Sequence, residues 1–254
     1  MQNNVFVSIC IPTYNGALYL DKCLKSVLNQ TYNFFDIIIS DDNSTDNTVE
    51  ICKKFGDKVE IFHDENLLFD ETLDKNILLE MALKKNPDFL LNLDTDEILM
   101  HNAKKILLDE INIFHSDADV FEFQFLEMWD KPNQYRYDGH ISNIWKKKLI
   151  RMKNQPDNLH YDDMPYSGNM HCPGIPQNSF GLNNSVRSRV KILHYGYFDS
   201  ESRQEKYDFY NKMDPNNTSF DGYRYLVSEN RKFSGPEGME FRLLHNSMVV
   251  SENE

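Results

Sequence analysis

The sequence contains no apolar stretch of the roughly 18 residues that a membrane-spanning helix requires. Its first residues, MQNNVFVSIC, lack the basic segment followed by a long apolar segment that marks a signal peptide. Its four cysteines are widely separated and form no CxxC pair, which indicates a reduced, intracellular setting. We therefore expect a cytoplasmic protein with no integral membrane segment.

Positive charge is also scarce in this chain. It has 27 Lys and Arg against 40 Asp and Glu, which gives a formal net charge of -13. Binding a nucleic acid duplex requires clustered basic residues that replace counterions, so we expect no nucleic acid partner. The densest basic run, WKKKLIR at 145–151, is short and typical of a solvated strand face. An acidic protein can still bind an anionic small molecule if a metal ion neutralises the contact.

Two glycine-rich nucleotide-binding motifs are missing as well. No G-x-G-x-x-G follows an apolar strand, which argues against a dinucleotide-dependent dehydrogenase. No G-x-x-x-x-G-K is present either, which argues against a kinase of the P-loop type.

The sequence does contain a regular alternation of apolar strands and amphipathic helices. Predicted strands cover 5–12, 34–40, 58–63 and 88–94, and predicted helices cover 13–32, 44–55 and 71–85. In the third helix, Leu73, Ile77 and Met81 align on one face. Strands that alternate with helices predict an α/β fold with a parallel sheet covered on both faces. A chain of 254 residues can bury a sizeable core of this kind.

The second half of the chain has a different pattern. A helix is predicted at 102–114 and a longer, antiparallel strand at 117–129. Residues 130–190 are rich in Asn, Pro, Gly, Tyr and Asp, which predicts loops and short strands that form one wall of a pocket. A last helix at 200–213 is predicted to begin with a capping box of Ser202 and Glu205.

Polar residues follow three of the predicted strands at the point where each strand ends. They are Pro12 to Asn15, Asp41 to Ser44, and Asp94 to Glu97. In an open parallel sheet, ligands bind beyond the carboxyl ends of the strands, so these groups should meet at one crevice. Asp94 and Asp96 repel each other unless a cation lies between them, and hard oxygen ligands suit Mg²⁺ or Mn²⁺. The sequence therefore predicts a divalent ion that carries a diphosphate.

Three segments resemble the hallmark blocks of family 2 glycosyltransferases with the GT-A fold. They are VSICIPTYNGALYLDKCLKSVLNQTY, DIIISDDNSTDNT and LLNLDTDEIL, in this order. The resemblance implies a Rossmann-like, mostly parallel sheet flanked by helices, with a smaller antiparallel, loop-rich C-terminal part. Residues 1–100 would form the nucleotide-sugar-binding half, and residues 101–245 the acceptor-binding and C-terminal half of the same domain.

The resemblance also implies roles for individual residues. The donor-binding set would be Pro12, Tyr14, Asn15, Asp42, Lys75, Asn76 and Asp94. Within this set Asp42 would accept a hydrogen bond from the base, and Lys75 with Asn76 would match the Arg-Asn step that precedes the acidic motif. The metal set, for Mn²⁺ or Mg²⁺, would be Asp94, Asp96 and His194.

The catalytic base is the least defined part of the resemblance. In GNMHCPGIP, Cys172 stands where many relatives carry a Glu, so no base can be assigned there. Asp162 and Asp163, in HYDDMPY, are the remaining carboxylates in the region where the base of such enzymes usually falls, and they are the candidates.

The resemblance predicts a metal-dependent, inverting glycosyltransferase. The donor would be a nucleotide-diphosphate sugar, with UDP favoured, and the acceptor a glycan, a protein or a lipid-linked molecule. Two other functions stay open: a non-catalytic sugar-nucleotide or glycan binder, and a sugar-1-phosphate nucleotidylyltransferase. The latter needs a glycine-rich loop with a basic residue after the first strand, whereas PTYNGALYL has one Gly and no basic residue. Asp42 as a helix cap and His194 as a core residue are also open.

Overall fold

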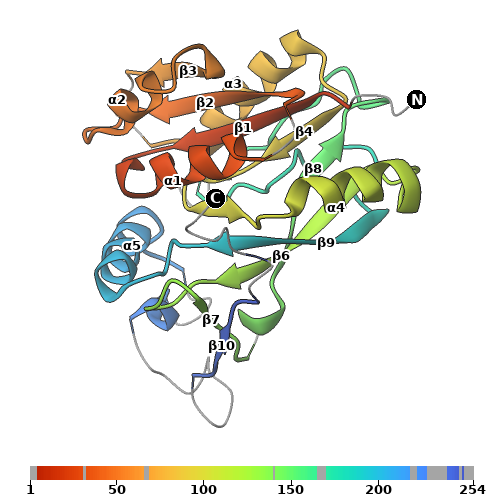
Figure 1. The fold of residues 1–254 in the computed structure, drawn as a ribbon. Coiled ribbons are helices and arrows are strands. Elements are labelled where there is room, and N and C mark those ends of the chain that lie inside the picture. The colour runs from red at the N-terminus through yellow and green to blue at the C-terminus, as the bar shows by residue number, and fades with distance from the viewer. Residues whose placement is uncertain are drawn as a thin grey trace.

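The computed structural model describes residues 5–30, 33–65, 69–139, 141–164, 170–217, 222–227, 239–245 and 248. These residues form a mixed eight-stranded sheet in the order β3-β2-β1-β4-β8-β6-β9-β5, with helices on its faces (Figure 1). The strands of the sheet are β1 (Val7–Thr13), β2 (Phe35–Asp42), β3 (Val59–Asp64), β4 (Phe89–Asn92), β5 (Glu97–Leu99), β6 (Val120–Glu127), β8 (Trp145–Arg151) and β9 (Ser185–His194). A separate small sheet pairs β7 (Gln134–Arg136) with β10 (Phe241–Leu243).

The helices largely follow the sequence pattern. They are α1 (Ala17–Leu28), α2 (Thr48–Lys53), α3 (Glu71–Lys85), α4 (Ala103–Asp109) and α5 (Ser200–Met213), with a π-helical turn at Glu110–Phe114 and 3₁₀ turns at Gly56–Lys58, Ile141–Asn143 and Arg224–Leu226. The predicted helix at 102–114 therefore exists, but its last turn is wider than an α-helix.

The first half confirms the predicted parallel sheet with helices on both faces. β1 pairs in parallel with β2 and with β4, and β2 pairs in parallel with β3. Because side chains alternate along a strand, Ile9 and Ile11 pack with α1 on one face, whereas Cys10 packs with α3 on the other. Burial on both faces explains why these strands read as continuous apolar runs.

The buried face of α3 differs from the predicted one. Leu73 is 43% exposed, and Ile77 and Met81 are half-buried. The fully buried side chains of the helix are Thr72, Asp74, Lys75, Leu78, Leu79 and Ala82. The prediction was wrong because the first two turns of α3 bury polar groups beside the site, which an apolar pattern does not reveal.

The second half joins the first through a continuous sheet. β8 pairs antiparallel with β4, and β6 pairs antiparallel with β8, as expected for the strand predicted at 117–129. β9 then runs parallel to β6 and antiparallel to β5, and its register places His194 opposite Glu97. This pairing carries a residue from late in the chain to the edge where β4 and β5 meet.

The start of α5 also differs from the prediction. The helix begins at Ser200, and the side chain of Asp199 accepts a hydrogen bond of 2.8 Å from the backbone N–H of Ser202. The hydroxyl of Ser202 is instead 2.8 Å from the hydroxyl of Tyr19 on α1. Asp199 is therefore the cap, and the predicted capping box is wrong.

The four cysteines are buried free thiols. Across the described ranges, no helix is both long enough and apolar enough to cross a bilayer.

Candidate active site

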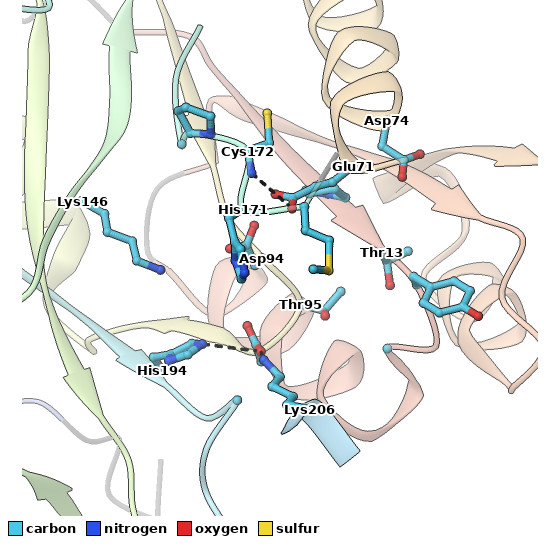
Figure 2. A pocket seen from close by; sticks show the side chains of 18 of the residues that line it. Thr13, Glu71, Asp74, Asp94, Thr95, Lys146, His171, Cys172, His194 and Lys206 are labelled. Carbon is cyan, nitrogen blue, oxygen red and sulfur yellow. Dashed lines mark hydrogen bonds and ion pairs between the residues drawn. The ribbon is translucent and has the colours of Figure 1, made fainter. Parts of the chain in front are cut away.

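A cavity of about 1090 Å³ opens at the carboxyl ends of β1 and β4 (Figure 2). Its walls come from both halves of the chain: the turn after β1, the turn between β4 and β5, the start of α3, β8, the segment at 170–175, the end of β9 and α5. The predicted site residues among its lining are Pro12, Tyr14, Asn15, Asp94, Asp96 and His194. The sheet thus brings together the first and third polar clusters and the late histidine.

Asp94 lies in the turn that follows β4 and is paired with a buried lysine. Lys148 Nζ is 3.1 Å from Asp94 Oδ2 and 2.8 Å from Glu97 Oε1, and the Lys148 side chain is only 2% exposed. The 145–151 run is therefore not a solvated face at Lys148, whose ammonium compensates the buried carboxylate of Glu97 and the partly buried one of Asp94. Although burial opposes ionisation, the ammonium groups of Lys148 and Lys75 hold the pKa of Asp94 below its usual range.

Glu97, the third carboxylate of the motif, belongs to the framework. Its Oε2 accepts a hydrogen bond of 3.0 Å from the backbone N–H of Asp94, and its side chain is fully buried. Burial and the charge of Asp94 raise the pKa of Glu97 to about 7. Glu97 thus closes the turn that presents Asp94 and Asp96.

Asp96 is held by two cationic groups. Lys206 Nζ on α5 is 2.6 Å from Asp96 Oδ2, and His194 Nε2 is 3.5 Å from the same oxygen. His194 Nδ1 also makes a short contact with Glu127 on β6. Burial opposes protonation of His194, but Glu127 and Asp96 outweigh it and raise the pKa of the imidazole to about 9.

The side chains of this site can be compared with the ligands that the predicted divalent ion needs. Asp94 Oδ1 is buried and receives no hydrogen bond from the described residues, so one hard oxygen ligand is open. Among those same residues, no three His, Cys, Asp or Glu side chains are grouped as a metal site. A ligand set of Asp94, Asp96 and diphosphate oxygens suits Mg²⁺ or Mn²⁺, and His194 would join it as a neutral imidazole. The metal and its three proposed ligands stay a prediction.

The end of the cavity that the turn after β1 forms is aromatic. The Tyr14 ring, 40% exposed, lies 5.5 Å from the ring of Phe69 and 6.1 Å from that of Phe209 on α5. Asn15 Oδ1 accepts a hydrogen bond of 2.8 Å from the backbone N–H of Thr45 and links the turns after β1 and β2.

Asp42 is not among the residues that line the cavity. It is buried, and its Oδ2 accepts a hydrogen bond of 2.9 Å from the backbone N–H of Asp70 at the start of α3. Burial raises the pKa of Asp42. A cap on α2 is not its role, since Asp46 accepts the hydrogen bond from Thr48 N–H there. Reading of the base by Asp42 stays a prediction.

Lys75 and Asn76 also lie outside the lining of the cavity. Lys75 Nζ donates to the carbonyl of Cys172 at 2.9 Å and pairs with Glu71 Oε1 at 2.6 Å. The Asn76 amide bonds both the N–H and the C=O of Tyr161, at 2.9 and 3.0 Å. These contacts tie α3 to Tyr161 and Cys172, and a direct phosphate contact stays a prediction.

Asp162 and Asp163 are exposed and do not line the cavity. Asp162 Oδ1 is 2.9 Å from His160 Nε2. Glu71, which the sequence did not single out, does line it. Glu71 Oε2 accepts from the backbone N–H of Cys172 at 3.4 Å, as Figure 2 shows.

Comparison with known proteins shows the family of this chain. The model of the family described as Glycosyl transferase family 2 matches residues 8–169, which is more than half of the chain. The chain belongs to this family. The match covers the ends of β1, β2 and β4, the segments that carry the predicted donor residues.

Relatives in the family match this chain over only part of their own length. "Glycosyltransferase GlyG" of Streptococcus pneumoniae is 31% identical over 142 residues, which are 55% of this chain and 42% of that protein. The "GalNAc(5)-diNAcBac-PP-undecaprenol beta-1,3-glucosyltransferase" of Campylobacter jejuni is 33% identical over 109 residues, 42% of this chain and 34% of that protein. The chain thus matches less than half of the length of either relative.

A solved structure shares the fold. S. aureus TarS 1-349 in complex with UDP-GlcNAc has a TM-score of 0.53 and 16% identity, with 90% of this chain and 73% of that chain covered. The α/β architecture is therefore that of the GT-A glycosyltransferases, as the sequence blocks predict.

Proposed function

We propose that this protein transfers a sugar from a nucleotide-diphosphate donor, with UDP favoured, to an acceptor hydroxyl. The observation that carries the proposal is the turn between β4 and β5, which presents Asp94 and Asp96 to a cavity of about 1090 Å³ at the carboxyl edge of the sheet. Family membership and the neighbour bound to UDP-GlcNAc support it.

The donor occupies the end of the cavity that the first half of the chain forms. The nucleoside lies against Tyr14, and the diphosphate extends to Asp94 and Asp96. A divalent ion held by these carboxylates would stabilise the negative charge of the departing diphosphate. Lys148, buried against Asp94 and Glu97, fixes the turn so that the carboxylates keep their orientation.

The acceptor occupies the opposite wall, which Trp145, Lys146, Met170 and His171 line. We propose a glycan, a protein or a lipid-linked molecule as acceptor. The acceptor hydroxyl attacks the anomeric carbon from the face opposite the leaving group, so the reaction inverts the configuration. Attack requires a carboxylate that accepts the hydroxyl proton.

We place this general base among Glu71, Asp162 and Asp163. The position of Glu71 in the cavity favours it, because a base must come within hydrogen-bond reach of the proton that it accepts. The backbone N–H of Cys172 and the ammonium of Lys75 orient its carboxylate from the acceptor wall. Asp162 and Asp163 would need their loop to move toward the cavity.

A thermal-shift panel tests the donor assignment. Nucleoside diphosphates and sugar nucleotides are added with Mn²⁺, and again with EDTA in place of the metal. Because a ligand that binds only the folded protein stabilises it by mass action, the correct donor should raise the melting temperature, and more with Mn²⁺. A panel in which no nucleotide raises it would contradict the proposal, and equal shifts in EDTA would contradict the metal dependence.

A further inference from the structure

One face of α5 forms part of the cavity wall. Five of its residues line the cavity, at the spacing of a helical stripe: Ser202, Glu205, Lys206, Phe209 and Tyr210. The start of the helix is fixed on two sides, because Ser202 Oγ lies 2.8 Å from Tyr19 OH and Arg203 Nη1 lies 3.0 Å from Asp130 Oδ1. Lys206 therefore projects from an anchored element.

The site contains three lysines that pair with its carboxylates, and they differ in how much of each ammonium is already bound. Lys75, 1% exposed, contacts Glu71 and two backbone carbonyls. Lys148, 2% exposed, contacts two carboxylates. Lys206 is 26% exposed; its ammonium pairs with one carboxylate, Asp96, and lies 5.3 Å from the centroid of the Tyr197 ring. An ammonium has three N–H donors, so Lys206 keeps donors for a ligand in the cavity.

The backbone around Lys206 is adapted to this cationic group. A Cβ on Gly196 would lie 2.3 Å from Lys206 Nζ, 2.5 Å from Asp96 Oδ2 and 2.8 Å from His194 Nε2. Any side chain at this position would displace the ammonium or the carboxylate. Glycine thus permits the close approach of Lys206 and Asp96 just after the carboxyl end of β9.

A diphosphate brings negative charge to a site that already holds Asp94 and Asp96. Burying like charges together is unfavourable unless a cation binds both, and charge-assisted hydrogen bonds to phosphate are stronger than neutral ones. We propose that Lys206 is a binding residue of the donor diphosphate: it neutralises Asp96 in the donor-free protein and donates to a phosphate oxygen when the donor binds. This inference rests on the proposed function.

Calorimetry in EDTA tests the contact without any metal. UDP, UMP and uridine are titrated into the wild type, Lys206→Met, Lys206→Gln and Lys206→Arg, with GDP, GMP and guanosine as a second series. We expect the wild type to bind the diphosphate more tightly than the monophosphate. Lys206→Met should lose about tenfold or more in diphosphate affinity, with nucleoside affinity unchanged.

Variants on the same helix separate this role from a structural one. Lys212→Met removes an exposed charge from α5 and should bind all three ligands as the wild type does. Lys206→Arg keeps the charge and should retain most of the diphosphate affinity, whereas Lys206→Gln should not. If Lys206→Met does not fold, the Gln and Arg variants still decide the question.

The outcomes are distinct for the inference and for the proposed function. A Lys206→Met or Lys206→Gln protein that keeps the full preference for diphosphate over monophosphate would overturn the inference. So would a wild type with no such preference in EDTA. If the wild type binds no nucleoside diphosphate even with Mn²⁺, the proposed function fails and the inference fails with it. Binding by the wild type with Mn²⁺ and equal binding by Lys206→Met overturns the inference alone.

Discussion

At the scale of single residues, the acidic motif shows that neighbouring carboxylates acquire different roles from their partners. Asp94 faces the cavity beside Lys148, and Glu97 closes the turn from within the core. The sequence locates these carboxylates because they follow an apolar strand. It does not reveal Lys148 as their partner or Glu127 as the partner of His194, since both residues reach the site only through the pairing of distant strands.

The protonated state of His194 makes the stability of the fold depend on pH. Glu127 and Asp96 raise the pKa of the folded protein's imidazole from its usual 6.5 to about 9. The folded state thus holds a proton that the unfolded chain releases, so this stabilisation is full below pH 6.5 and is lost as the pH rises through about 9. The difference in unfolding free energy between the wild type and His194→Gln should shrink from pH 6 to pH 9.5.

Urea denaturation at several pH values measures this difference, and His115→Gln serves as the matched control. His115 is half-buried at the end of the π-helical turn. Its variant controls for the loss of an imidazole outside the Glu127–Asp96 site. A constant difference between the wild type and His194→Gln across the range would mean that folding does not change the pKa of His194.

Replacement of the general base should separate catalysis from donor binding. We expect Glu71→Gln to lower turnover by roughly 10² to 10⁴ with little change in donor affinity. Asp162→Asn and Asp163→Asn test the two other candidates, whose side chains are exposed outside the cavity. Initial rates at saturating donor, together with the pH profile of Glu71→Asp, provide the measurement. Near-normal turnover of Glu71→Gln, with a loss in either Asp variant, would move the base to the loop at 162–163.

At the scale of secondary structure, the sequence predicts which segments are helices better than it predicts which face of each is buried. The helix at 200–213 exists, yet its inner face carries Ser202, Lys206 and Tyr210. A hydrophobic pattern assigns such residues to solvent, because it cannot distinguish a wall of a polar cavity from the protein surface. The same limit explains the incorrect face of α3, where Asp74 and Lys75 are buried.

The junction of β9 and α5 should not tolerate a side chain at position 196. We expect Gly196→Ala to lower the unfolding free energy by about 1 to 3 kcal/mol, because its Cβ would overlap the Lys206–Asp96 pair. Chemical denaturation of Gly196→Ala checks this value. The same change made in the Lys206→Ala background should lower the unfolding free energy by less, because the side-chain atom nearest to the new Cβ is then absent. Equal costs in the two backgrounds would show that the overlap with Lys206 does not matter.

At the scale of the whole molecule, the alternating pattern and three sequence blocks predict the parallel half and the fold family. The antiparallel half could not be derived in the same way, because its pairs join residues far apart, such as Glu97 with His194. The overall charge of -13 is also a poor guide to the site, where Lys146, Lys148 and Lys206 gather. The polar residues near strand ends were therefore predictable, whereas the cations that pair with the carboxylates among them were not.

The turnover of the sugar nucleotide itself tests the central claim most directly. The purified protein is incubated with the donor that the thermal-shift panel selects, Mn²⁺ and no acceptor, and the free nucleoside diphosphate is measured over time. The account predicts slow release of nucleoside diphosphate, because water can replace the acceptor hydroxyl, and a large loss of release in Asp96→Asn. Donor binding without any release, or pyrophosphate-dependent exchange in place of release, would contradict a glycosyltransferase.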